Sequence, residues 1–171
     1  MATPVDAPLL VELGARTFRE TYRDISDNVE LDDYIAKNFT LRAFQAQLSD
    51  PNARLLVGMQ AGRAIGYGHL RMSQAPACVV ATSPVEISRL YLEQSVKGNG
   101  HGSALMRALL DQASQWECDA VWLGIYAENH RARAFYERWR FKEVGHHDFM
   151  FGGTLYSDPV MSRLVHEAQI R

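Results

Sequence analysis

The sequence has few cysteines, no excess of positive charge and no long apolar run. Its 171 residues include two cysteines, Cys78 and Cys118, which are too few for a disulfide framework or a zinc site. Eighteen Lys and Arg against 20 Asp and Glu give a net charge of −2, whereas dedicated nucleic-acid-binding domains usually carry a basic excess. No apolar run approaches the ~18 residues that span a bilayer. These absences argue against a disulfide-stapled protein, a nucleic-acid binder and a membrane protein.

The chain also lacks the signs of a secretory leader and of a second domain. Its first 15 residues carry Asp6 and Glu12 but no Lys or Arg, unlike a signal peptide. There is no internal repeat and no linker rich in Pro, Gly or Ser. At ~150 residues per domain, the length predicts a single domain over residues 1–171. We therefore expect one cytoplasmic domain.

Hydrophobic periodicity predicts a helical first third and an alternating second half. Helices are expected at residues 8–22, 31–39 and 41–49, with Thr40 capping the third. The following strands are residues 54–59, 64–72 and 85–92, and the first two form a hairpin. Helices at 102–116 and 129–139 then alternate with strands at 120–126, 141–151 and 160–164, the last two joined through Gly152-Gly153. This order predicts an α/β fold with a mixed sheet and a parallel crossover between residues 85–92 and 120–126.

The most informative segment is the glycine turn, Lys97-Gly98-Asn99-Gly100-His101-Gly102-Ser103. It lies between a predicted strand and a predicted helix, where free backbone N–H groups and the helix dipole favour a phosphate. A Walker loop is excluded because no lysine precedes Ser103, and a dinucleotide-binding turn fits poorly because Ser103 stands where its third glycine belongs. By itself the segment is compatible with a phosphate site or with an ordinary flexible turn.

Two motifs of the chain resemble those of the GNAT N-acetyltransferase superfamily and follow each other in the same order. Lys97-x-x-Gly100-x-Gly102 is similar to its acyl-CoA loop, and the preceding Ser88-Arg89-Leu90-Tyr91-Leu92 is similar to its fourth strand. About 35 residues downstream come Asn129, Ala132 and Phe135-Tyr136-Glu137-Arg138-x-x-Phe141, similar to its second signature. Lys97 replaces the usual Arg or Gln, and Arg140 replaces a glycine. If the chain needs a positive φ at Arg140, that residue costs ~1 kcal/mol.

The resemblance implies a GNAT fold with splayed central strands, and acetyl-CoA as cosubstrate. Backbone groups of Tyr91 and Leu92 would pair with the pantetheine arm, and residues 98–103 would hold the pyrophosphate. Asn129 would cap its helix and contact the CoA arm, and Arg138 would lie near the 3′-phosphate. The implied cofactor-binding residues are Tyr91, Leu92, Lys97, Gly98, Asn99, Gly100, His101, Gly102, Ser103, Asn129 and Arg138.

The same resemblance nominates Tyr136 as the general acid for the leaving thiolate and Glu86 as the general base acting through water. By pattern alone Tyr136 is a core residue, because it shares a helix face with Ala132 and Phe135. Glu86 is equally readable as a strand-edge charge or as the ion-pair partner of Arg89. No metal site is expected. His101, His146 and His147 lack partners at ligand spacing and read as loop and strand residues.

The acceptor is expected to be a primary amine of a small molecule. Residues 20–33 carry six acids, Glu20, Asp24, Asp27, Glu30, Asp32 and Asp33, against one base, Arg23, and such a segment attracts polycations or is simply solvated. Residues 17–22, 89–91 and 122–124 are similar to the PaiA-type spermidine/spermine N-acetyltransferases. A peptide or protein acetyltransferase and a non-enzymatic acyl-CoA sensor remain alternatives. No nucleic-acid or membrane partner is expected, and a homodimer fits the superfamily.

Overall fold

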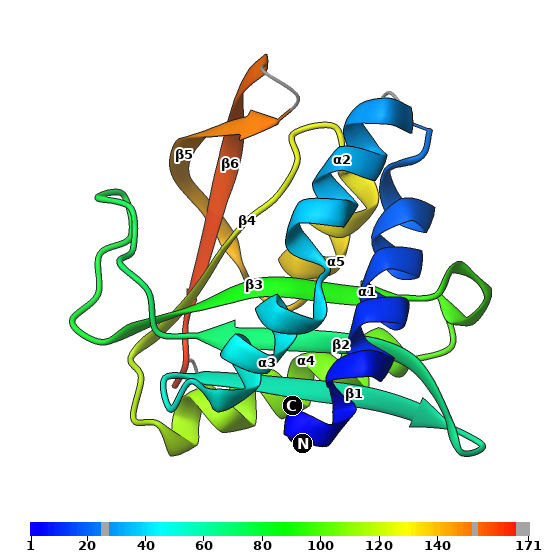
Figure 1. The fold of residues 1–171 in the computed structure, drawn as a ribbon. Coiled ribbons are helices and arrows are strands. Elements are labelled where there is room, and N and C mark those ends of the chain that lie inside the picture. Colours follow the sequence, from blue (N-terminus) through cyan, green and yellow to red (C-terminus); the bar gives the residue numbers. More distant parts are fainter. Residues whose placement is uncertain (25–27, 152–153, 167–171) are drawn as a thin grey trace. The chain divides into compact units, whose positions relative to one another are not determined.

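The computed structural model describes residues 1–24, 28–151 and 154–166, and their contacts form two compact units. The first unit is Met1–Leu70 with Arg89–Leu109, and the second is Arg71–Ser88 with Leu110–Arg171. Six strands are hydrogen-bonded in the order β1-β2-β3-β4-β6-β5 (Figure 1). The predicted α/β fold with a mixed sheet is confirmed. No helix in the described ranges is long and apolar enough to cross a membrane.

The first unit contains the predicted helices and hairpin. Its elements are η1 (Pro4–Asp6), α1 (Ala7–Tyr22), α2 (Asn28–Asn38), α3 (Leu41–Ser49), β1 (Ala53–Gln60), β2 (Arg63–Arg71), the end of β3 (Pro84–Leu92), η2 (Gln94–Val96) and the start of α4 (His101–Gln115). The predicted cap is confirmed, because Thr40 Oγ1 accepts a hydrogen bond from the Ala43 N–H at 3.1 Å. Helix α2 begins three residues before its predicted start.

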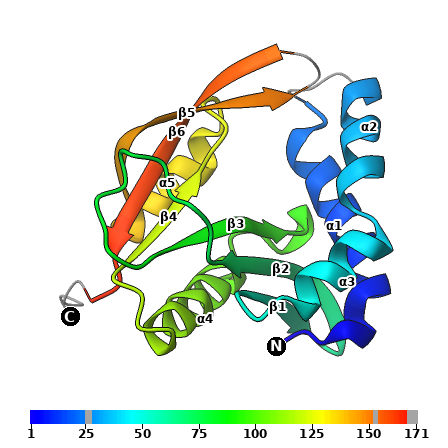
Figure 2. The same ribbon diagram turned by 60° about the vertical axis from the view of Figure 1, so that its left-hand side comes forward.

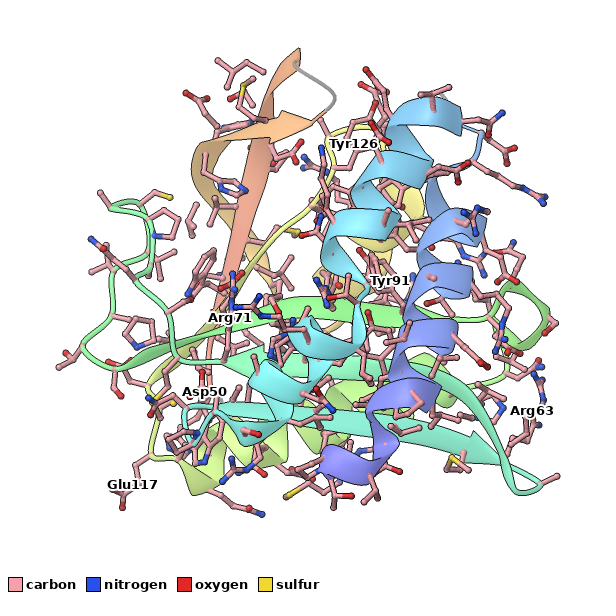
Figure 3. The ribbon with its side chains drawn as sticks, in the orientation of Figure 1. Asp50, Arg63, Arg71, Tyr91, Glu117 and Tyr126 are labelled. Atoms are coloured by element: carbon pink, nitrogen blue, oxygen red, sulfur yellow. The ribbon has the colours of Figure 1, made fainter. Side chains whose placement is uncertain are left out.

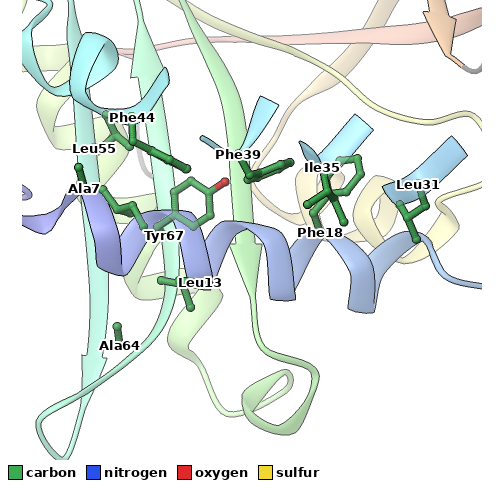
Figure 4. Close-up of a cluster of buried hydrophobic side chains, with 11 residues drawn as sticks. Ala7, Leu13, Phe18, Leu31, Ile35, Phe39, Phe44, Leu55, Ala64 and Tyr67 are labelled. Atoms are coloured by element: carbon green, nitrogen blue, oxygen red, sulfur yellow. The ribbon is translucent and has the colours of Figure 1, made fainter. Parts of the chain in front are cut away.

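The core of this unit forms where the apolar face of α1 meets α2, α3 and the hairpin (Figure 4). Leu10, Leu13 and Phe18 lie on that face at helical spacing and are buried. The Phe18 ring stacks on Tyr34 of α2 with centroids 4.8 Å apart and tilts against Phe39 at 5.1 Å. This packing fixes α1 beside the segment that leads into the glycine turn.

The second unit is built on β4 (Ala120–Gly124), β5 (Lys142–Phe151) and β6 (Thr154–Leu164), with α5 (His130–Arg138) between β4 and β5 in the chain. The first residues of β3 pair with β4 in parallel, which confirms the predicted crossover. That register ends at Glu86↔Trp122, although both strands continue beyond it. The segment between β2 and β3, green in Figure 2, packs Val79 against Trp122 and Val160.

The last strand is longer than predicted. It was expected to begin at Val160, but β6 begins at Thr154. Asp158 and Pro159 favour turns in a sequence-based reading. In the structure their backbone continues the antiparallel pairing, with His147 opposite Asp158 and His146 opposite Pro159. The predicted turn at Gly152-Gly153 lies outside the described residues.

Candidate active site

The glycine turn leads directly into the N-terminus of α4. Gly98 has φ 96° and Gly100 has φ 85°, and a Cβ at either position would meet nothing within 4 Å. Only glycine adopts this backbone without strain. The Ala104 N–H donates to the Gly100 carbonyl at 3.0 Å, so the N–H groups of residues 101–103 have no acceptor within the helix. This is the geometry of an anion site at a helix N-terminus.

The other predicted residues of the turn surround this backbone. Asn99 is exposed, whereas Lys97, His101, Gly102 and Ser103 are half-buried. All seven residues, 97–103, belong to the first unit.

A buried carboxylate anchors the start of the turn. Glu93 is 4% exposed and accepts hydrogen bonds from Arg16 at 2.6 Å and Arg63 at 2.7 Å. The Gln94 N–H donates to the Glu20 carboxylate at 2.8 Å. Charge-assisted hydrogen bonds of this kind are stronger than neutral ones, so α1 and β2 hold the segment that precedes the glycines. Glu93 was not found by sequence reasoning, since its partners are 77 and 30 residues away.

The end of β3 presents backbone where the pantetheine arm was expected. Tyr91 and Leu92 are half-buried. The ring of Tyr91 packs near Phe18 and Tyr67, with centroids 5.8 Å and 6.0 Å away. Burial raises the pKa of the Tyr91 phenol well above its ordinary value, so the hydroxyl stays protonated. The side chain of Tyr91 is thus part of the core, which leaves the main chain for ligand contacts.

In the second unit, Glu86 is a fixed, buried carboxylate. It is 8% exposed, and its oxygens accept hydrogen bonds from Arg71 Nε at 2.7 Å, Arg71 Nη2 at 3.1 Å and Ser73 Oγ at 2.6 Å. Arg71, the last residue of β2, is labelled in Figure 3. The Arg89 guanidinium instead lies 4.8 Å from the centroid of the Phe39 ring. The reading of Glu86 as the ion-pair partner of Arg89 is therefore wrong, because Arg71 takes that place.

Helix α5 carries the second motif. The Asn129 side chain accepts a hydrogen bond from the Ala132 N–H at 3.1 Å, which confirms the predicted cap. Tyr136 is 8% exposed, and its ring lies edge-on to Phe141 with centroids 5.6 Å apart. Arg138 is exposed, and its guanidinium lies 5.9 Å from the centroid of the Phe135 ring.

Arg140 follows α5 in a left-handed conformation. Its φ is 64°, where a glycine would be unstrained. The Phe141 N–H donates to the Tyr136 carbonyl at 3.0 Å across this turn. The backbone therefore does need a positive φ at Arg140, and we expect this side chain to lower the free energy of unfolding by ~1 kcal/mol relative to glycine.

Asp158 is a buried carboxylate that sequence reasoning missed, since it lay between two predicted strands. It is 8% exposed, and its Oδ1 has no hydrogen-bond partner among the described residues. Desolvation raises the pKa of this carboxyl, while the Ala127 N–H and the nearby His147 act in the opposite direction. A raised carboxyl pKa in a buried position is characteristic of functional sites. In the described ranges no three His, Cys, Asp or Glu side chains are grouped so as to hold a metal ion.

Comparisons with known proteins identify the family. The model of the acetyltransferase (GNAT) family matches residues 15–141. The chain belongs to the GNAT acetyltransferase family. An uncharacterised N-acetyltransferase of Mycobacterium tuberculosis is 32% identical over 158 residues, which cover 92% of this chain and 97% of that protein. The expected N-acetyltransferase, with acetyl-CoA as the family's cosubstrate, is confirmed at this level.

Solved structures show the same fold with different named activities. A PaiA N-acetyltransferase from Thermoplasma acidophilum, solved with coenzyme A, has a TM-score of 0.78 at 18% identity and covers 95% of both chains. A ribosomal-protein-alanine N-acetyltransferase from Brucella melitensis has a TM-score of 0.66 at 19% identity and covers 95% of this GNAT chain and 96% of its own. At such identities the likeness supports the fold and leaves the acceptor open.

Proposed function

We propose that this GNAT protein transfers the acetyl group of acetyl-CoA directly to a primary amine of a small molecule. The observation that carries the proposal is the glycine turn, because Gly98 and Gly100 adopt positive φ immediately before α4. Open space above both glycines leaves room for a phosphate to approach the backbone. The pyrophosphate of CoA has the charge that such a terminus favours.

In the first unit, the main chain of Tyr91 and Leu92 would pair with the pantetheine arm, and residues 97–103 would bind the pyrophosphate. In the second, Asn129 would contact the CoA arm, and the exposed guanidinium of Arg138 would bind the 3′-phosphate. Acetyl-CoA supplies the thioester whose C–S bond breaks in the transfer. The PaiA N-acetyltransferase from Thermoplasma acidophilum was solved with coenzyme A, which supports a CoA ligand for this fold.

Acetyl transfer needs one group that accepts a proton and one group that donates a proton. The amine must lose a proton before its lone pair can attack, and the departing thiolate must gain one. We assign the second role to Tyr136, whose side chain is buried on α5 and held by Phe141. A fixed phenol can donate its proton to sulfur without first reorganising.

Glu86 is the carboxylate that the sequence nominated as the general base, and that assignment stays a proposal. Its three hydrogen bonds with Arg71 and Ser73 leave about one acceptor position of a carboxylate open. A base acting through water would use that position. The bidentate contact with Arg71 fixes the position of this carboxylate on β3.

Some of the acids in residues 20–33 support a cationic acceptor. Asp32 and Asp33 are exposed on α2, and Asp32 pairs with Arg19 at 2.5 Å. Glu20 is occupied by the Gln94 N–H, and Asp24 lies 3.6 Å from Arg23. Asp27 lies outside the described residues. The acids available to a polyamine are therefore fewer than the composition of residues 20–33 indicates.

If a polyamine is the acceptor, replacing Asp32 and Asp33 with Asn should raise KM for spermidine about 3- to 10-fold, because the distal ammonium groups lose their carboxylates. KM for n-butylamine should change less, and added salt should reduce the difference between the two amines. Steady-state kinetics with both amines measures this. Asp111→Asn, which removes an exposed acid of α4, is the matched control. Equal effects on the two amines would show that Asp32 and Asp33 are ordinary solvated surface residues that do not bind the acceptor.

A further inference from the structure

Two carboxylates are buried among the described residues of the second unit, Glu86 and Asp158, and they lie on one face of its sheet. Glu86 lies opposite Trp122 in the parallel pair, so their side chains point to the same side. Gly124, two residues on, shares that side and lies opposite Val160. Asp158 is two residues before Val160 and therefore lies on the same face as Glu86.

His147 joins Asp158 on this face. The two residues are directly opposite in the β5–β6 pair, an arrangement that brings cross-strand side chains together. The imidazole lies against Gly124, since a Cβ at that position would be 2.5 Å from His147 Nε2. Gly124 closes β4, and the chain then leads to Asn129 and α5. His147 is half-buried, whereas Asp158 is buried.

We propose that His147, in place of Glu86, accepts the proton of the acceptor's ammonium group and that Asp158 is the positioning residue behind it. The inference rests on the proposed acetyl transfer and names a residue pair for its first step. An imidazole ordinarily gains and loses a proton near neutral pH. The carboxylate has an unpartnered oxygen that can accept an imidazole N–H, which fixes the ring and stabilises the imidazolium.

The ammonium proton moves to the imidazole of His147, and the freed lone pair of the amine attacks the thioester carbonyl carbon. The C–N bond forms and the C–S bond breaks. The thiolate takes a proton from Tyr136, and the nitrogen loses its second proton to solvent, which reprotonates the Tyr136 phenolate. The imidazolium of His147 releases its proton to solvent, so each transfer releases one proton overall.

Acceptors that are already neutral provide the decisive comparison. At pH 8 ethylamine, benzylamine and spermidine are ammonium ions, whereas 2,2,2-trifluoroethylamine and aniline are not. His147→Gln should lower kcat/KM at least ~10²-fold for the cationic amine that the wild type uses best and less than ~3-fold for the neutral amines. Asp158→Asn should show the same split with a smaller loss of about 10-fold. Thiol release measures both.

Two variants serve as controls for this experiment. His146→Gln changes the adjacent residue, which the strand places on the opposite face, where its Nε2 lies 3.7 Å from Glu143. It should keep wild-type kinetics. Gly124→Ala should reproduce the split, because the new methyl displaces the imidazole while leaving both polar side chains present.

Stability and cofactor binding separate a folding defect from the proposed role. Burial raises the pKa of Asp158 in the folded protein. The free energy of unfolding therefore falls as the pH rises through that pKa and the carboxylate ionises. Asp158→Asn should therefore unfold at no lower temperature than the wild type at pH 8. Every variant should keep the increase in Tm that acetyl-CoA produces.

The outcomes distinguish this inference from the proposed function. Equal losses for cationic and neutral amines, unchanged kinetics of His147→Gln, or a selective loss in Glu86→Gln but not in His147→Gln would overturn the role of His147. The last of these results would assign the proton to Glu86. A wild-type protein that binds acetyl-CoA and acetylates none of the amines would instead contradict the proposed function.

Discussion

Gly100→Glu should abolish the increase in Tm that acetyl-CoA gives the wild-type protein. The new carboxylate would lie where the pyrophosphate is expected, and a side chain at φ 85° would strain the turn. At a ligand concentration of 100 Kd, binding stabilises a fold by ~2.7 kcal/mol. For a protein of this size that corresponds to a shift of roughly 5–10 °C, which thermal unfolding measures with and without acetyl-CoA.

Gly62→Glu is the matched control for that variant. Gly62 also has a positive φ, 78°, and a Cβ there would also meet nothing within 4 Å. It lies in the turn between β1 and β2 instead of before a helix. Both variants should unfold at a lower temperature without ligand, but only Gly100→Glu should lose the response to acetyl-CoA. A full response in Gly100→Glu would remove the glycine turn from the cofactor site.

Tyr136→Phe should lower kcat by ~10²-fold or more and leave KM for acetyl-CoA nearly unchanged. The substitution removes the proton that the thiolate needs but keeps the ring, which packs edge-on against Phe135 and Phe141. Steady-state kinetics by thiol release separates the two parameters. Wild-type kcat in this variant would make Tyr136 a packing residue only.

Tyr67→Phe controls for the loss of a buried phenol hydroxyl as such. Tyr67 is fully buried in the core of the first unit, where its ring packs against Phe44 with centroids 6.0 Å apart. Its substitution should change the free energy of unfolding and leave kcat within about twofold of the wild-type value. Similar losses of kcat in both variants would indicate a general effect of buried tyrosine hydroxyls.

Local signals in the sequence predicted much of the fold. Thr40 and Asn129 are caps because a short polar side chain before a helix accepts the N–H three residues on, and both bonds are present. The alternating glycines predicted a turn that needs positive φ, and Gly98 and Gly100 adopt it. These features depend on neighbours in the chain, which is why a single sequence reveals them.

Features that depend on distant partners were not predictable in this way. Glu86 could have paired with several arginines, and in the structure it binds Arg71, whereas Arg89 lies over the Phe39 ring. Asp158 and Pro159 discourage a strand locally, but pairing with β5 carries β6 through them. The position of Asp158 opposite His147 is a consequence of that register. The roles of Tyr136 and Glu86 came from the resemblance to the GNAT family and remain proposals.

Two other readings of the same fold predict different behaviour in solution. A peptide or protein acetyltransferase would modify an amino-terminal peptide in preference to small amines. A non-enzymatic sensor would bind acetyl-CoA without consuming it.

The most direct test of acetyl transfer to a small amine is thiol release by the purified wild-type protein. Acetyl-CoA is incubated with ethylamine, benzylamine, spermidine or a short peptide with a free amino terminus, and the products are analysed by mass spectrometry. We expect CoA thiol and acetylated small amine in equal amounts, at a rate well above that without protein. An increase in Tm with acetyl-CoA, but no amine-dependent thiol release from any acceptor, would contradict the account.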